Sequence, residues 1–154
     1  MKKYFLELIK RGILPLIAFL VFSCGLKSVP SEYTFIENGL VNVELSKLGN
    51  GKILIYNGAG FLYKMDNTGE LNIWIDGKSL GQLRTNEYVV IDLEKGKRKF
   101  EILHFDVVNM GSKKEVEIDE HTKIIRIKPN LFSNRLSVTN KMPGNFAEFR
   151  YAKK

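Results

Sequence analysis

Residues 71–83 read Leu71-Asn72-Ile73-Trp74-Ile75-Asp76-Gly77-Lys78-Ser79-Leu80-Gly81-Gln82-Leu83. In the first five residues, leucine and isoleucine recur with a period of two, which indicates a half-buried β-strand rather than a helix. Asp76-Gly77 then gives the signal of a two-residue hairpin, because a type I′ turn needs positive φ at both central positions. We expect residues 78–83 to leave that turn as a second strand. The stretch therefore predicts a β-hairpin. We expect the same two-residue period of apolar side chains in the strands that follow.

The sequence around this hairpin continues in short β-rich runs that turn residues separate. No window of ten or more residues after position 23 shows a helical stripe. Strands spaced roughly 8–12 residues apart predict an all-β fold, a single antiparallel β-sandwich of the Ig-like kind. The alternative is a partly open barrel with one short helix near residues 131–136. The other expected strands are residues 53–56, 88–93, 98–105, 116–118 and 122–128, with weaker candidates at 136–138 and 146–151.

Length and charge limit the classes of protein to consider. The chain has 154 residues, and residues 52–154 form the expected β-sandwich domain, which suits one hydrophobic core. The formal net charge is +7; four basic residues and one acid among the first eleven account for +3, which leaves +4 for the remainder. This mild excess favours an anionic surface but is too small to indicate nucleic-acid binding.

The first 23 residues have the composition of a signal peptide. Residues 13–22 are apolar apart from Pro15 and follow a basic start. Because this run is too short to cross a ~30 Å bilayer comfortably, we interpret residues 1–23 as a cleaved signal helix rather than a retained anchor. The run ends at Cys24, the only cysteine, so an internal disulfide is excluded. Residues 24–51 are then the modified cysteine, a tether and a lead-in, in which Tyr33–Val43 fits either a first strand or a packed segment.

Residues Leu20-Val21-Phe22-Ser23-Cys24 resemble the lipobox of bacterial lipoproteins. The resemblance implies signal cleavage between Ser23 and Cys24, followed by a diacylglyceryl thioether on Cys24 and an acylated amine. Fatty acids such as palmitate would make this anchor effectively permanent. The resemblance also implies a lipid-anchored place in the bacterial cell envelope, with the domain facing the periplasm or the outer face. The absence of Asp after the cysteine, where Gly25 stands, favours the outer membrane over the inner membrane.

A second resemblance covers about residues 53–128. Asp76-Gly77-Lys78-Ser79-Leu80-Gly81-Gln82-Leu83, Tyr88 and Leu93-Glu94-Lys95-Gly96-Lys97 are similar to a pattern found in small β-sandwich domains of unknown function in bacterial lipoproteins. PEGA-type surface domains share this rhythm. Lys95 stands where that pattern often has proline, and no histidine follows Gly96. The family has no assigned catalytic residues, so the resemblance implies a fold and not a reaction.

We expect no catalytic residue, metal site or cofactor. The sequence lacks the S-x-x-K and H-E-x-x-H motifs, and the letters G-x-S-x-G occur at residues 77–81 only within the predicted hairpin, without the strand-to-helix turn that exposes a nucleophilic serine. Asp119-Glu120-His121 places three candidate ligands together, but neighbours in a tight turn point apart, so we expect a solvated turn and no metal. His104 alternates with apolar residues and is expected to be a packed or edge histidine. Gly58-Ala59-Gly60 lacks the lysine and helix of a phosphate loop and is interpreted as a connection between strands.

Lys95-Gly96-Lys97-Arg98-Lys99 is the most concentrated run of charge. On a hairpin it would project its cations from one end of the domain, where they could contact anionic lipid headgroups or a surface polysaccharide. The alternative is a charged turn that blocks edge pairing and keeps the protein soluble. The candidate contacts with an anionic surface are Lys95, Lys97, Arg98 and Lys99.

The aromatic residues Trp74, Tyr88 and Phe105 could form a ligand face, but we expect them to fill the core instead.

Together these features predict a lipid-anchored, non-enzymatic envelope protein that acts as a binding or interaction module. Its expected partners are the membrane, through acyl chains on Cys24, and an anionic lipid, a polysaccharide or an envelope protein, but no nucleic acid. The alternative is a structural accessory subunit that docks into an envelope complex by strand addition at a sheet edge. A hydrolase assembled from scattered side chains is the least favoured hypothesis.

Overall fold

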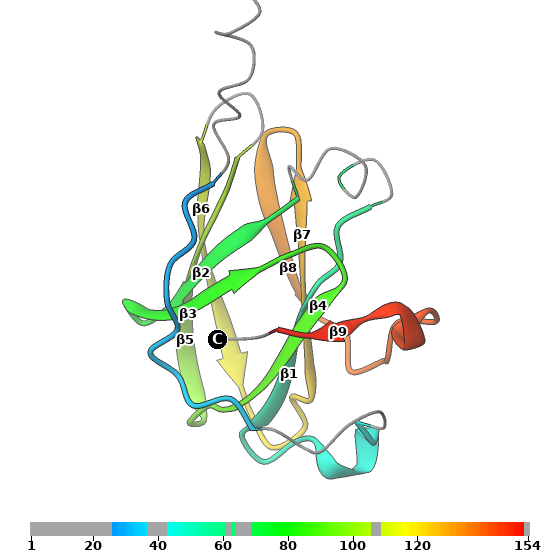
Figure 1. The fold of residues 1–154 in the computed structure, drawn as a ribbon. Helices are drawn as coiled ribbons and strands as arrows, with labels where there is room; N and C mark the ends of the chain where they lie inside the picture. The colour runs from blue at the N-terminus through cyan, green and yellow to red at the C-terminus, as the bar shows by residue number, and fades with distance from the viewer. Residues whose placement is uncertain (1–25, 37–42, 61–62, 64–68, 106–108, 153–154) are drawn as a thin grey trace, which may run out of the picture.

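The computed structural model describes residues 26–36, 43–60, 63, 69–105 and 109–152. These residues form mostly β-strand, with two one-turn 3₁₀ segments, η1 (Leu45–Lys47) and η2 (Phe146–Glu148). The strands build two separate sheets and do not close into a barrel (Figure 1). The prediction of an all-β fold is confirmed in this form, and the segment considered for a short helix instead forms a turn and a strand.

The first sheet has the spatial order β8-β7-β1-β4-β9, and the second has the order β3-β2-β5-β6. The predicted hairpin at Asp76-Gly77 is present, with φ of 52° and 81° at its two central residues. The chain also crosses between the sheets after β1, β3, β4 and β6. The strands are β1 (Lys52–Asn57), β2 (Leu71–Ile75), β3 (Lys78–Leu83), β4 (Glu87–Asp92), β5 (Gly96–Phe105), β6 (Asn109–Ile118), β7 (Ile124–Asn130), β8 (Ser133–Val138) and β9 (Arg150–Tyr151).

The five-stranded sheet is mixed rather than antiparallel. β1 pairs with β7 in parallel, and β4 pairs with β9 in parallel. The prediction of a wholly antiparallel sandwich was therefore wrong for these two pairs. Hairpin signals in a sequence predict pairing between neighbouring strands, whereas β7 and β9 reach their partners only after the chain has crossed between sheets.

The main core lies between the sheets and follows from the period of two. Leu71, Ile73 and Ile75 of β2 are fully buried, and so are Phe100 and Ile102 of β5. These side chains meet those of the first sheet, which include Ile53, Ile55, Val89, Ile91, Ile125 and Ile127. Alternate positions of each strand thus supply one continuous apolar layer.

A second apolar cluster covers the outer face of the five-stranded sheet. Tyr56 and Tyr88 project to this side, where Phe146, Phe149 and Tyr151 from the C-terminal segment pack against them. The ring centroids of Tyr56 and Phe149 lie 5.3 Å apart in an edge-on arrangement, which is a favourable geometry for aromatic pairs. β1 and β4 are consequently buried on both faces, which explains why both read as nearly continuous apolar runs.

The three aromatic residues expected in the core are distributed differently. Tyr88 is buried, but in the outer cluster rather than between the sheets. Trp74 is half-buried on the outer face of β2, and Phe105 is half-buried at the end of β5. The expectation was wrong for Trp74, because its neighbours Ile73 and Ile75 occupy the inward positions of that strand.

The described part of the lead-in, residues 26–36, lies along β3 as a docked segment and is not a strand. Glu32 donates its backbone N–H to the carbonyl of Ser79 at 2.9 Å. The Ser79 hydroxyl donates to the carbonyl of Pro30 at 2.8 Å, and the Ser79 N–H donates to the Glu32 carboxylate at 2.6 Å. Residues 33–36 are thus a packed segment, while residues 37–42 and Cys24 lie outside the described residues.

Candidate functional site

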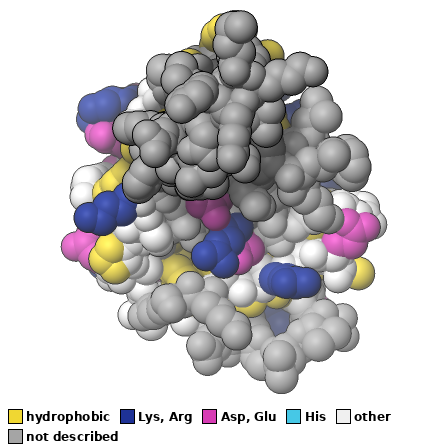
Figure 2. Space-filling model, turned by 45° about the horizontal axis from the view of Figure 1, so that its top comes forward, with side chains coloured by type: hydrophobic (Ala, Val, Ile, Leu, Met, Phe, Trp, Pro, Cys, Tyr) yellow, Lys and Arg dark blue, Asp and Glu magenta, His cyan; other side chains and the backbone are white. Residues whose placement is uncertain are grey.

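Basic and acidic side chains are interspersed on the face of the molecule that Figure 2 presents. Interspersed charges of this kind favour solubility. The predicted basic run, residues 95–99, lies at the start of β5, and its local charge depends on the groups that surround it in space.

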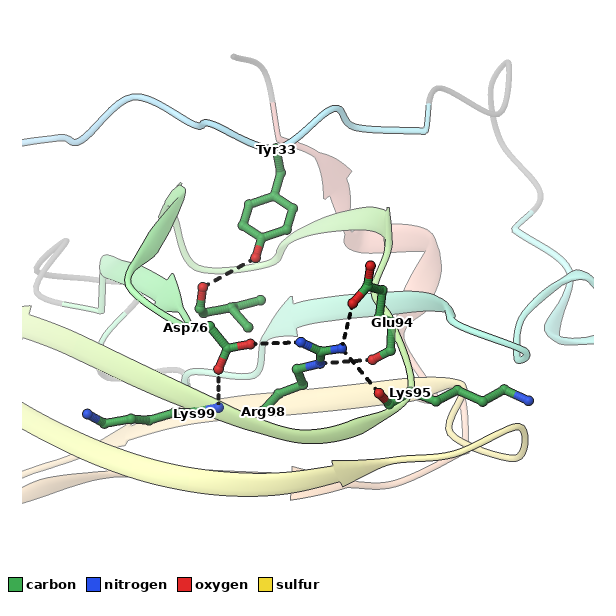
Figure 3. Close-up of polar contacts among 7 residues, drawn as sticks. Tyr33, Asp76, Glu94, Lys95, Arg98 and Lys99 are labelled. Carbon is green, nitrogen blue, oxygen red and sulfur yellow. Dashed lines mark hydrogen bonds and ion pairs between the residues drawn. The ribbon is translucent and has the colours of Figure 1, made fainter.

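Arg98 stands at the centre of the cluster that Figure 3 shows. Its guanidinium donates to the Asp76 carboxylate at 3.1 Å and to the Glu94 carboxylate at 3.1 Å. It also donates to the backbone carbonyls of Glu94 and Lys95, at 2.9 and 3.1 Å. The side chain is only 20% exposed. Arg98 thus fixes the β4–β5 connection against the β2–β3 turn, and most of its donors are used within the protein.

Asp76 is held by the adjacent strand as well as by Arg98. The backbone N–H of Lys99 donates to the Asp76 carboxylate at 2.8 Å. This hydrogen bond, and then the Arg98 guanidinium, hold the pKa of the Asp76 carboxyl below its ordinary value. The docked lead-in adds Tyr33, whose hydroxyl donates to the carbonyl of Ile75 at 3.3 Å. The turn, the lead-in and the start of β5 are therefore tied together at one end of the sandwich.

The lysines of the run also have acidic neighbours. Lys95 Nζ lies 3.8 Å from the Glu120 carboxylate, and Lys99 Nζ lies 3.2 Å from the Glu101 carboxylate. Lys97 stands opposite Glu117 in the β5–β6 register. Residues 96–99 begin β5, and the connection before them joins strands of different sheets, so the run does not project from a hairpin as the sequence suggested. Contact with an anionic surface through Lys95, Lys97, Arg98 and Lys99 stays a prediction, and these neighbours weaken the local positive potential on which it depends.

The contacts of Asp76 give a pH dependence that can be measured. Because its pKa is lower in the folded protein than in the unfolded chain, its contribution to stability is present above about pH 4 and is lost as the pH falls through the folded value. Asp76→Asn keeps the side-chain shape and tolerates the positive φ. We expect the variant to be less stable than the parent at pH 7, with the difference narrowing on acidification. Urea unfolding at a series of pH values measures this difference, with Asp92→Asn at an exposed site as the matched control; a constant difference would contradict the prediction.

Asp119-Glu120-His121 forms the exposed connection between β6 and β7. The Asp119 carboxylate accepts from the Thr122 hydroxyl at 2.7 Å and from the backbone N–H groups of Thr122 and His121, at 2.7 and 3.0 Å. These bonds lower the pKa of Asp119, with the Thr122 hydroxyl as the largest cause. The Asp119 carboxylate therefore stabilises the turn through hydrogen bonds, and the turn is exposed to solvent as predicted. In the part of the chain that the structure describes, no three His, Cys, Asp or Glu residues are grouped to hold a metal ion.

The remaining candidates from the sequence are structural. His104 is fully buried on the inward side of β5, as a packed histidine. Gly58-Ala59-Gly60 follows β1 as a loop, and the Ala59 N–H donates to the side chain of Asn57 at 3.0 Å. Neither feature supplies an exposed reactive group.

Two shallow hollows lie on the described surface. One, of about 310 Å³, is polar and lies beside the β3–β4 turn, where Arg84 pairs with Glu70 at 3.4 Å. The other, of about 440 Å³, lies on the outer face of the four-stranded sheet, between Trp74, Leu103 and Lys113. Ligand sites usually bury most of their ligand in a deeper cavity, so both hollows suit contact with a surface better than enclosure of a small molecule.

A surface feature that the sequence reasoning missed is the turn between β7 and β8. Leu131 is 61% exposed and Phe132 is 85% exposed. The signal was present in the sequence, because Pro129-Asn130 and Ser133-Asn134 flank two consecutive large apolar residues. Turns normally carry polar residues, and exposed apolar residues there call for a functional explanation.

Comparisons with other proteins add no family to these observations. Among the described residues, no helix is long and apolar enough to cross a membrane. No protein-family model, no curated protein and no solved structure matches this chain.

Proposed function

We propose that this protein is a lipid-anchored component of a bacterial cell envelope, and that its β-domain is a non-enzymatic binding or interaction module. The observation that carries the proposal is the position of Cys24, which follows a basic start, the apolar run of residues 13–22 and Ser23. Cleavage before Cys24 and acylation of its thiol would leave the β-domain on the membrane surface. The absence of Asp after Cys24, where Gly25 stands, favours the outer membrane over the inner membrane.

The shape of the domain supports an interaction role. Both hollows are shallow, and the cations of residues 95–99 are used largely in contacts within the protein. Such a molecule recognises a partner through its surface rather than through an enclosed cavity. As part of this proposal we assign the two sheets to the Ig-like class of sandwich, because the chain crosses repeatedly between them.

A structural accessory subunit is the second candidate, and the exposed edge of β6 favours it. β6 is a ten-residue strand at the end of its sheet, and most of its side chains are exposed. Its outer edge offers backbone groups for strand addition by a partner, although Asn134 of β8 already donates to the Met110 carbonyl. Lys113, Lys114 and Glu115 are also the kind of charged residues that discourage strand addition. Photo-crosslinking from position 115 of β6, which is exposed, separates the two candidates in intact cells: a single protein adduct supports docking, and its absence supports surface binding.

Replacing Cys24 tests the anchor. We expect Cys24→Ser to move the protein from the detergent phase to the aqueous phase on phase partitioning, because the variant has no thiol to acylate. The control is Cys24→Ser combined with Ser28→Cys, which restores a thiol outside the lipobox and should not restore partitioning. Mass spectrometry of the parent should show loss of residues 1–23 and a mass increase on Cys24. An intact N-terminus with an unmodified thiol would refute the proposal.

A further inference from the structure

The described chain begins at one end of the sandwich, and it is already docked there. The carbonyl of Leu26 accepts from the Gln82 side chain at 3.3 Å, and the carbonyl of Lys27 accepts from the Asn72 side chain at 2.7 Å. Two residues span at most about 7 Å of extended chain. A lipid on Cys24 would therefore hold this end of the domain close to the bilayer, with little free tether between them.

The turn between β7 and β8 lies at the same end. Asn72, which binds the lead-in, pairs with Leu103 near the end of β5. Asn134, next to the β7–β8 turn, donates to the carbonyls of Ile102 and Met110 at 3.2 Å each. Ile102 and Leu103 are consecutive residues, so both contacts are made at one level of the sandwich. Figure 1 shows the β7–β8 turn and the start of the described chain together at the top of the view.

This turn presents the most exposed large apolar side chains among the described residues. Phe132 is 85% exposed and Leu131 is 61% exposed. Aromatic and aliphatic side chains at the tip of a loop are suited to the interfacial region of a bilayer. Their position beside the point where the anchor would enter gives them a lipid surface within reach.

The hairpin that carries the turn is basic in its own sequence. Residues 121–147 contain no Asp or Glu, but they include Lys123, Arg126, Lys128, Arg135 and Lys141. Lys128 and Arg135 stand opposite each other in the β7–β8 register. They share the outer face of the sheet, because Ile127, Pro129 and Asn134 occupy the buried positions. Like charges placed opposite each other are destabilising, which favours an anionic partner at this place, in contrast to residues 95–99.

We propose that the β7–β8 turn docks on the lipid surface, with Leu131 and Phe132 in the interfacial region and Lys128 and Arg135 against anionic headgroups. The proposal rests on the proposed acylation of Cys24 and adds a second membrane contact, which fixes the orientation of the domain. Long basic side chains can keep their charges among headgroups while neighbouring apolar residues enter the interface.

An environment-sensitive fluorophore at the turn tests the docking. Ser133→Cys places the label beside Phe132 in the full-length, acylated protein, whose Cys24 thiol would be blocked. Glu117→Cys is the control, at an exposed position of β6 that stands opposite the start of β5, away from the turn. On vesicles of phosphatidylcholine with phosphatidylglycerol, we expect several-fold brighter, blue-shifted emission at position 133 that a quencher attached to lipid reduces, and no change at position 117.

Substitutions at the turn give the second arm of the test. In the Ser133→Cys protein, we expect Leu131→Ser with Phe132→Ser to abolish the spectral shift, and Lys128→Gln with Arg135→Gln to remove its dependence on phosphatidylglycerol. Vesicle sedimentation is measured in parallel. A protein that sediments but keeps a water-like label at position 133 overturns the docking and leaves the anchor intact. A protein that stays in solution and takes up the fluorophore at Cys24 overturns the proposed acylation. A label at position 133 that is already shielded from water without vesicles indicates that a second copy of the chain covers the turn, and it overturns the lipid proposal.

Discussion

Replacing Phe100 by alanine is expected to destabilise the domain by about 3–5 kcal/mol, the usual cost of removing a buried phenyl ring. Phe100 has no exposed surface and is the largest fully buried side chain among the described residues. It stands opposite Ile75 in the β2–β5 register and within the main apolar cluster. The loss combines the transfer free energy of the ring with the cavity left between two sheets, which cannot collapse without breaking strand pairing.

The chain offers a matched control for this substitution. Phe132→Ala removes the same side chain from a site where it is 85% exposed, so we expect a change within about 0.5 kcal/mol. Urea unfolding monitored by the fluorescence of Trp74, the only tryptophan, measures both variants. Because small domains are stable by only about 5–15 kcal/mol, Phe100→Ala should shift the midpoint strongly. Equal effects of the two substitutions would contradict the assignment of the core.

Much of the sheet structure could be predicted from the sequence because it is encoded locally. Asp76-Gly77 adopts the positive φ values that its turn requires, and the alternation of Leu71, Ile73 and Ile75 matches the buried face of β2. The parallel pairs of β1 with β7 and β4 with β9 could not be predicted in this way. They depend on crossings between sheets, and no turn signal records which distant strand will arrive beside an edge.

The local charge around the candidate site also could not be predicted from the sequence alone. The run of residues 95–99 is basic in sequence, yet Asp76 and Glu120, at least 20 residues away, supply two of its acidic neighbours. Charge in a sequence is local, whereas electrostatic potential depends on every group within a few ångströms. The docked lead-in is a further example, since residues 26–36 have the composition of a linker but are held by Ser79 and Asn72.

Asn57 makes buried hydrogen bonds that could not be predicted from its position before a glycine-rich turn. Its replacement should destabilise the domain nearly as much as the replacement of Phe100. Its side chain is fully buried. The side-chain amide donates to the carbonyls of Gly69 and Leu83 at 2.6 and 3.0 Å, and its oxygen accepts from the Ala59 N–H at 3.0 Å. One side chain therefore satisfies three backbone groups and joins the end of β1 to the start of β2 and the end of β3.

Asn57→Ala would leave those backbone groups without this partner. Each buried polar group left unsatisfied costs about 1–3 kcal/mol, and partial entry of water should limit the total to about 2–4 kcal/mol. Asn57→Asp keeps the shape but replaces the donor by an oxygen facing two carbonyls, so we expect at least the same loss at pH 7. That loss should shrink on acidification, because protonation removes the buried charge and restores one donor. Asn109→Ala, at the exposed start of β6, is the control that should leave the midpoint of urea unfolding unchanged. A pH-independent difference between Asn57→Asp and the parent would show that the side chain at position 57 reaches solvent.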